Sequence, residues 1–181
     1  MKILAFGGSL RSGSFSKTIL NESVKLTPEN VKMEIFDIGQ IPLFDQDYEK
    51  DMPEIVKNFK QIVKNADAIL IVTPEYNYSI PGFLKNAMDW ASRPYGDNAF
   101  EDKPAAIISC STGMLGGSRA QYHLRQTLVF LNMHTINKPE VMIPFVDKKI
   151  NNNELTDKET KDKIAGIIKA LADWAERIKV K

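Results

Sequence analysis

A run of small and hydroxylated residues near the amino terminus has the composition of an anion-binding loop. It reads Gly7-Gly8-Ser9-Leu10-Arg11-Ser12-Gly13-Ser14-Phe15-Ser16. Serine hydroxyls donate hydrogen bonds, arginine offers a planar charged fork to phosphate oxygens, and glycine permits tight turns. Where such a loop opens a helix, free backbone N–H groups and the positive end of the helix dipole also attract an anion. The composition predicts a phosphate site, although an ordinary strand-to-helix loop capped by Ser14 or Ser16 fits it equally well.

The letters of this loop exclude the two best-known nucleotide motifs. Gly8 and Gly13 have the Walker spacing, but Ser14 stands where the phosphate-binding lysine is required. The loop also lacks a G-x-G-x-x-G sequence. Nucleoside triphosphate hydrolysis and a Rossmann dinucleotide site are therefore disfavoured.

A second loop, Thr73–Gly82, contains two prolines and two tyrosines. The prolines stiffen the backbone, so amides from Glu75 to Asn77 could read the donors and acceptors of a ring, with Tyr76 beside it. Ser79 is placed to cap the following helix. The alternative is that the tyrosines cover a sheet edge and that Asn77 supports a turn.

A third loop, Ser109–Gly117, is also rich in small residues. Its glycines would let a flat ring approach the backbone closely, and its amides would favour negative charge on that ring. Cys110 has no second cysteine in a C-x-x-C arrangement and follows an apolar run. We expect a small buried residue there rather than a redox thiol.

Each of these loops follows a segment that reads as a strand. Ile3–Phe6, Ala68–Val72 and Ala105–Ile108 are continuous apolar runs, which is typical of strands buried on both faces. Val31–Ile35 alternates polar and apolar residues like a strand nearer an edge, and Glu140–Phe145 is a weaker fifth candidate.

Helical periodicity separates the predicted strands. Apolar residues recur with the helical period in 19–24, in 55–63 and in the last segment, where Thr156 and Glu159 have the spacing of a capping box. The alternation predicts an α/β fold with a doubly wound five-stranded parallel sheet and helices on both faces, for which 2-1-3-4-5 is a common strand order. The three loops then meet at the carboxyl edge of the sheet, where such folds bind ligands.

The sequence resembles the NADPH-dependent FMN reductase family. Within this family, it most resembles the bacterial quinone and chromate reductases and azoreductases. Three ordered motifs carry the resemblance: Ser9–Ser16, Pro74–Trp90 and Gln121–Gln126. It implies a flavodoxin-like fold, a homodimer or homotetramer, and non-covalent FMN. By position, the implied cofactor-binding residues are Ser9, Leu10, Arg11, Ser14, Phe15, Ser16, Pro74, Glu75, Tyr76, Asn77, Cys110, Ser111 and Gly113. Two positions depart from the family pattern. The family commonly has asparagine where this chain has Ser16, and it often has serine where this chain has Cys110.

The implied activity is FMN-dependent oxidoreduction, with NADPH or NADH as hydride donor and a quinone, an azo compound or a metal oxyanion such as chromate as small-molecule acceptor. Because the flavin supplies the chemistry, no catalytic side chain is expected. The alternatives are a flavodoxin-type electron carrier and a flavin-free regulatory protein of the same fold. A carrier steered by charge usually has one dominant sign, whereas this chain has 24 basic and 23 acidic residues.

The remaining expectations concern organisation. With 181 residues, 43% of them hydrophobic, the chain is expected to form one domain over 1–181, and the balanced charge argues against nucleic acid and acidic membranes. One cysteine, and a short apolar start at 1–6, favour a cytoplasmic location. His123 and His134 stand apart, so no metal site is expected. The segment Arg119–Leu131 has more apolar residues than a helix needs to pack one face against a sheet, which predicts a subunit interface. Arg119 and Glu140 could form a polar contact between the subunits.

Overall fold

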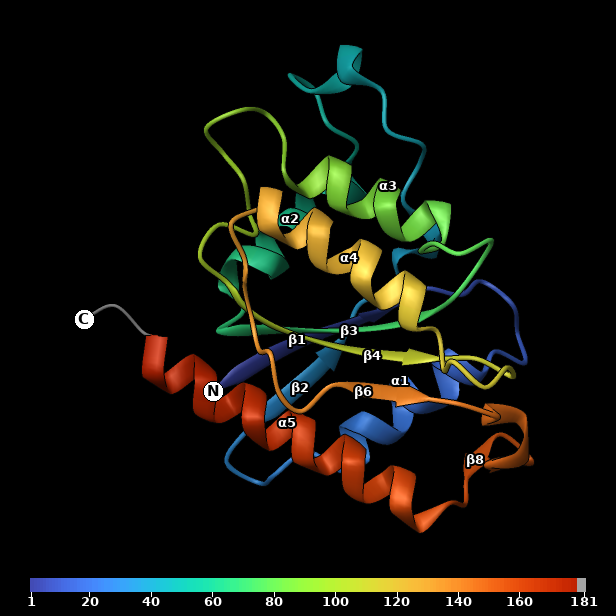
Figure 1. Cartoon of the computed structure of the whole chain (residues 1–181). Coiled ribbons are helices and arrows are strands. Elements are labelled where there is room, and N and C mark those ends of the chain that lie inside the picture. The colour runs from blue at the N-terminus through green and yellow to red at the C-terminus, as the bar shows by residue number, and fades with distance from the viewer. Residues whose placement is uncertain (179–181) are drawn as a thin grey trace.

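A parallel sheet with helices on both faces forms the centre of the structure, a computed structural model that describes residues 1–178 (Figure 1). The strands are β1 Lys2–Gly7, β2 Lys32–Ile35, β3 Ala68–Pro74, β4 Pro104–Cys110, β5 His134–Thr135 and β6 Val141–Ile143. They pair in the order β2-β1-β3-β4, with both β5 and β6 paired to β4. The predicted flavodoxin-like order 2-1-3-4-5 is therefore confirmed.

The fifth position of the sheet is divided between two short strands. β5 pairs with the start of β4, His134 opposite Pro104, and β6 pairs with its end, Ile143 opposite Cys110. The prediction of a strand over 140–145 was right in place but too long, and it missed β5. Between them lies Pro139, which has no N–H to donate to a ladder.

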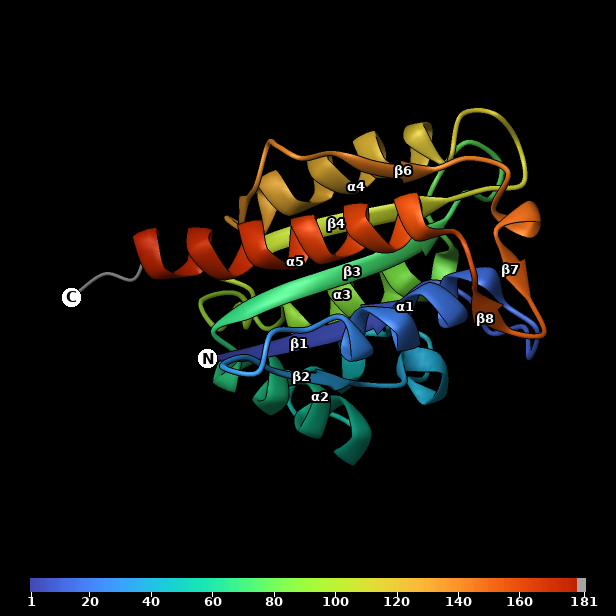
Figure 2. The same cartoon turned by 90° about the horizontal axis from the view of Figure 1, so that it is seen from below.

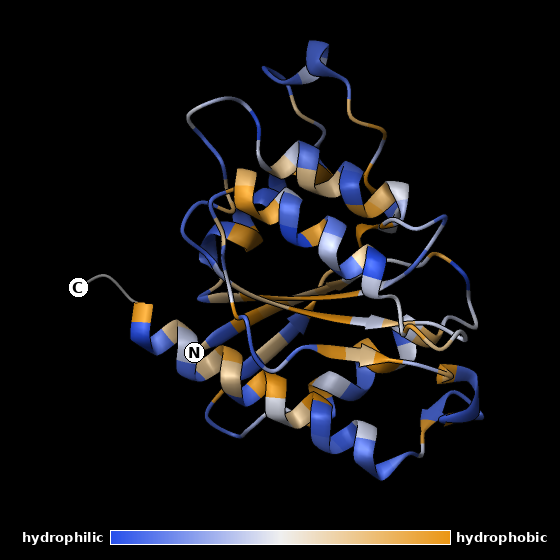
Figure 3. Ribbon diagram, in the orientation of Figure 1, coloured by the Kyte–Doolittle hydropathy of each residue, from blue (hydrophilic) through white to orange (hydrophobic). Residues whose placement is uncertain are grey.

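The helices cover the two faces unequally (Figure 2). Helices α2 Glu54–Asn65, α3 Gly82–Ala91 and α4 Ser118–Phe130 lie on one face, and α1 Phe15–Lys25 and α5 Lys158–Ile178 lie on the other. Alternate residues of β1 point to opposite faces: Leu4 joins one core cluster and Ile3 joins the other. Apolar strands enclosed by helices on both sides account for the continuous hydrophobic runs, which Figure 3 shows in the middle of the molecule.

The amino terminus of α5 differs from the predicted capping box. Asp157, not Thr156, caps the helix, because its Oδ2 accepts hydrogen bonds from the Thr160 backbone N–H at 2.8 Å and from the Thr160 hydroxyl at 2.6 Å. The Thr156 hydroxyl instead donates to the Lys149 carbonyl at 3.1 Å. The helix begins one residue later than a Thr156 cap requires, and a carboxylate competes well for the free N–H groups.

The long connection after β2 projects beyond the helices and carries the short 3₁₀ helices η1 Ile38–Gln40 and η2 Gln46–Tyr48. Asn86 of α3 anchors it, because its Oδ1 accepts from the Phe44 N–H at 2.7 Å and its Nδ2 donates to the Pro42 carbonyl at 2.8 Å. After β6 come η3 Val146–Lys148 and the hairpin of β7 Ile150–Asn151 with β8 Glu154–Leu155.

Candidate functional site

Three loops meet at the carboxyl edge of the sheet and enclose a cavity of about 200 Å³. Its lining consists of Ser9, Arg11, Ser14, Phe15 and Ser16 from the first loop, Pro74, Glu75 and Tyr76 from the second, Cys110, Ser111 and Thr112 from the third, and Val146. Of the predicted cofactor-binding residues, Leu10, Asn77 and Gly113 are not in this lining. Thr112 lies within the predicted stretch from Cys110 to Gly113, whereas Val146 was missed. Val146 lies in η3, and its backbone N–H donates to the Ser111 carbonyl at 3.1 Å. Because this contact joins residues far apart in the sequence, no local pattern predicts it.

The first loop concentrates hydroxyl groups at the positive end of α1. Ser14 is the N-cap, its Oγ accepting from the Lys17 N–H at 3.3 Å and lying 2.9 Å from the Ser16 Oγ. Both serines are buried, whereas Arg11 is exposed, with its guanidinium 5.3 Å from the centre of the Phe15 ring. The ordinary capping role and the phosphate-type donor set therefore coexist in the same loop. Hydroxyls, free first-turn N–H groups and an exposed cation together fit a phosphate dianion.

The second loop is a tight hairpin turn. Tyr76 and Ser79 exchange two backbone hydrogen bonds of 2.9 Å each, and the intervening Asn77 and Tyr78 have φ values of +50° and +66°. Two successive positive φ values match a type I′ turn. The predicted cap of α3 by Ser79 is wrong, because the helix begins after Pro81 without a side-chain cap and the Ser79 Oγ lies 3.2 Å from His123 Nδ1.

The third loop contains the lone cysteine. Cys110 is 2% exposed, and burial raises the pKa of its thiol to about 12. The thiol therefore stays neutral at physiological pH, and its expected place as a small buried residue is confirmed. Next to it, the Ser111 Oγ accepts from the Gly113 N–H at 3.1 Å, which holds the start of the loop in a turn.

Arg119 and Glu140 have partners within their own chain. Arg119 Nη1 lies 3.3 Å from Glu75 Oε1, and the Tyr122 hydroxyl donates to Glu140 Oε2 at 3.3 Å. The polar contact between subunits that was expected of these two residues stays a prediction.

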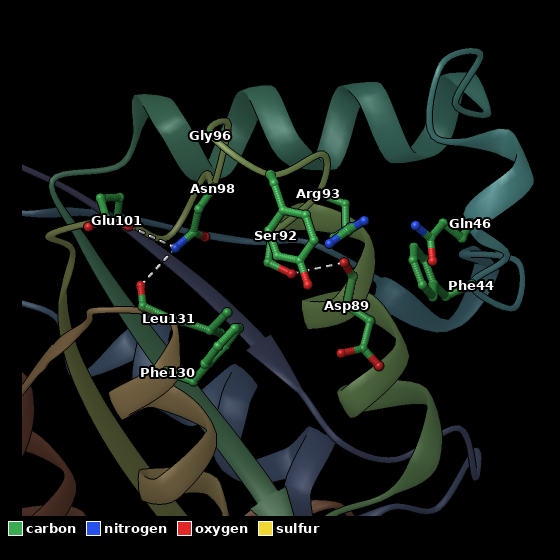
Figure 4. Close-up of a pocket in the computed structure, with 11 residues that line it drawn as sticks. Phe44, Gln46, Asp89, Ser92, Arg93, Gly96, Asn98, Glu101, Phe130 and Leu131 are labelled. Atoms are coloured by element: carbon green, nitrogen blue, oxygen red, sulfur yellow. Dashed lines mark hydrogen bonds between the residues drawn. The ribbon is translucent and has the colours of Figure 1, made fainter.

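A roomier cavity, of about 550 Å³, lies at the other end of α3 (Figure 4). Its polar groups bond to one another: Asn98 Nδ2 donates to the Leu131 carbonyl at 2.8 Å, and the Ser92 Oγ donates to the Asp89 carbonyl at 2.9 Å. Arg93 is already paired with Glu49. The Asp89 carboxylate pairs with Lys85, and the Glu101 carboxylate accepts from Asn98 and Asn132, so these groups also have partners and volume alone does not make this cavity the functional site.

Two further features are absent from residues 1–178. Within that range no three His, Cys, Asp or Glu side chains gather as metal ligands would. The same residues include no helix that is both long and apolar enough to cross a membrane.

This strand order, with a phosphate-type loop at the switch point between β1 and β3, defines a flavodoxin-like protein. The chain belongs to the NADPH-dependent FMN reductase family, whose sequence model matches residues 1–148. It is 46% identical over 181 residues to an NAD(P)H-dependent FMN reductase of Pseudomonas aeruginosa, covering 99% of this chain and 97% of that one. It is 38% identical over 185 residues to a quinone reductase of Escherichia coli, covering 99% and 98%. A solved flavoenzyme NAD(P)H:(acceptor) oxidoreductase of Paracoccus denitrificans superposes with a TM-score of 0.90 at 34% identity, covering 97% of both chains.

Proposed function

We propose that this protein is an FMN-dependent NAD(P)H oxidoreductase that reduces quinones, azo compounds or metal oxyanions such as chromate. The observation that carries the proposal is the convergence of a phosphate-type loop, a rigid hairpin and a glycine-rich loop on one cavity at the switch point. The names of the Pseudomonas aeruginosa and Escherichia coli relatives support the activity. A cytoplasmic location, where reduced nicotinamides are available, belongs to the same proposal.

The cavity suits part of a mononucleotide. Pockets that enclose a whole drug-sized ligand usually measure roughly 300–1,000 Å³, so about 200 Å³ would hold one portion and leave the rest at the open rim. We assign the phosphate and ribityl end to Ser9, Leu10, Arg11, Ser14, Phe15 and Ser16. We assign the ring to Pro74, Glu75, Tyr76 and Asn77, with Cys110, Ser111 and Gly113 at its border. Ser16 would contribute its hydroxyl on the phosphate side.

Bound FMN would supply the redox chemistry, accepting a hydride from NADPH or NADH and passing reducing equivalents to the acceptor. The side chains of the cavity bind and orient, and none is set up as a nucleophile or base. The Cys110 thiol is protonated, and the hydroxyls of Ser14 and Ser16 are bonded to each other. An exposed rim would admit acceptors of different shapes, which fits loose selectivity.

We also propose that the protein is a homodimer or homotetramer built on α4. Tyr122, Val129 and Phe130 of this helix are 50%, 75% and 80% exposed, an unusual amount of apolar surface. Burial of such side chains between copies is favourable at about 25 cal/mol per Å². Light scattering at micromolar concentration should give a multiple of 20.4 kDa, and a purely monomeric mass would contradict the proposal.

The activity is tested by reconstitution with FMN and anaerobic addition of NADH or NADPH. We expect a yellow protein that bleaches on addition of a nicotinamide and regains its colour with a quinone. A protein that takes up no FMN would refute the proposal. Bleaching that only a protein acceptor reverses would favour the electron carrier.

Comparing FMN with riboflavin tests the assignment of Arg11 to the phosphate. Arg11→Gln should weaken FMN binding about tenfold and leave riboflavin binding unchanged, because riboflavin lacks the phosphate that the guanidinium would meet. Lys25→Gln, which removes an exposed cation at the far end of the same helix, is the matched control and should change neither. Equal losses for both ligands with Arg11→Gln would show that Arg11 acts on the fold rather than on phosphate.

A further inference from the structure

Glu75 lies in the loop assigned to the flavin ring, but its carboxylate is bonded elsewhere. Its Oε2 accepts from the backbone N–H groups of Arg119 at 3.1 Å and Ala120 at 3.3 Å, and its Oε1 accepts from Arg119 Nη1 at 3.3 Å. The side chain is 12% exposed. A largely buried carboxylate with three donors is a specific structural arrangement rather than a solvated surface charge.

Helix α4 needs this carboxylate because it has no cap of its own. Its N-cap is Gly117, with φ +81°, and a Cβ there would meet Ser109 Cβ at 3.1 Å and the Cys110 carbonyl oxygen at 3.3 Å. The close approach to β4 excludes the serine or aspartate that usually caps a helix. Arg119 and Ala120 are the second and third residues of α4, whose N–H groups a cap normally satisfies. Glu75 therefore caps α4 from a position 44 residues earlier in the chain.

The same bond couples the second loop to the third. Gly117, at the end of the third loop, leads directly into the helix that Glu75 caps. The Arg119 guanidinium also lies 4.0 Å from the centre of the Tyr78 ring, and His123 lies against Ser79. The hairpin is thus held to α4 at both of its ends. The first loop, by contrast, meets the hairpin through a 3.4 Å contact between Ser9 Oγ and the Tyr76 hydroxyl.

We propose that Glu75 is a positioning residue of the flavin site, an inference that rests on the proposed function. By capping α4 it sets the backbone of 74–77 against the ring. Its negative charge also offsets the positive end of α4 and the Arg119 cation, so it disfavours the extra negative charge of reduced flavin and lowers the reduction potential.

Glu75→Gln tests the charge, because glutamine keeps the length and one acceptor oxygen. Reduced FMN should then bind about tenfold more tightly relative to oxidised FMN, which raises the two-electron midpoint potential by about 30 mV. Asp157→Asn is the matched control. It makes the same change at a carboxylate that caps α5, on the opposite face of the sheet, and should leave the potential unchanged. A potential that Glu75→Gln leaves unchanged or lowers would overturn the charge effect.

Glu75→Ala tests positioning, with hydrogen exchange of the flavin-free protein as readout. Exchange at the Arg119 and Ala120 amides and in 76–79 should quicken about tenfold or more, and Glu75→Gln should restore most of the protection. Unchanged exchange in Glu75→Ala would overturn the capping role whether or not flavin binds. If the wild-type protein takes up no FMN while exchange responds as expected, the proposed function fails and the capping role stands.

Discussion

Gly116→Ala should be strongly destabilising, because Gly116 lies where the third loop crosses β6. Its φ is +58°, and a Cβ built on it would lie 2.9 Å from the Ile143 nitrogen, 2.9 Å from the Met142 carbonyl carbon and 3.0 Å from the Ile143 carbonyl carbon. All three are backbone atoms of β6, so no side-chain rotation relieves the overlap. Either the loop or the strand must shift.

The magnitude follows from two contributions. A left-handed conformation costs an L-residue about 1–2 kcal/mol, and forcing an extra methyl group into a packed site costs about 1–3 kcal/mol. Together they predict a loss of about 2–5 kcal/mol in the free energy of unfolding. For a chain of this size each kcal/mol lowers Tm by roughly 2–4 °C, so the melting midpoint should fall by about 4–20 °C. FMN affinity should fall as well, since the third loop borders the cavity.

Thermal unfolding of the flavin-free protein, followed by circular dichroism, measures the effect without contribution from binding. Gly166→Ala is the matched control, because Gly166 lies inside α5 with nothing within 4 Å of an added Cβ. That variant should gain about 0.5–1 kcal/mol from helix propensity. If Gly116→Ala melts within a degree of the wild type, the close approach of this loop to β6 is not present in the protein.

Two further predictions concern titration. The Cys110 thiol, whose pKa burial raises to about 12, should resist alkylation by iodoacetamide in the native protein at pH 8. Rapid alkylation of the native protein would contradict the burial. Because the thiol of the unfolded chain ionises at lower pH than the buried thiol, the free energy of unfolding should decline as pH rises from about 9 towards 12. Urea titrations should show a smaller decline for Cys110→Ser. The hydroxyl and backbone N–H of Thr160 lower the pKa of Asp157 to about 2, so its contribution is present above about 3.8 and is lost as pH falls towards 2. Asp157→Ala should therefore cost about 1 kcal/mol at pH 7 and progressively less in acid, and a pH-independent difference would refute the capping role.

Much of the fold could be predicted from the sequence because its strands are buried on both faces. β3 and β4 are continuous apolar runs, and their alternation with helices is enough to predict a doubly wound parallel sheet with right-handed crossovers. β5 could not be predicted, since two residues such as His134 and Thr135 carry no period, and their pairing is set by the adjacent β4. The start of α5 was misplaced because neighbouring threonine and aspartate compete for the same cap position.

The candidate site could be predicted as a set of loops but not as a set of side-chain directions. Residue types and strand ends were enough to bring Ser14, Pro74 and Cys110 to one cavity. Val146 was missed because only tertiary pairing brings η3 beneath the third loop. The Ser79 hydroxyl was assigned to the wrong partner for a similar reason, since His123 is distant in sequence. Long-range partners of polar side chains leave no local period to detect.

Different helices hold the two halves of the cavity. The first loop is held by the cap of its own helix, α1, whereas the second and third loops are held together at the start of α4 by Glu75 and Gly117. Between the halves, the first and second loops share the hydroxyl contact of Ser9 with Tyr76, at the long end of the hydrogen-bond range. A substitution at the start of α4 should therefore act mainly on the second and third loops, which surround the ring, and a substitution in the first turn of α1 should act mainly on the phosphate donors.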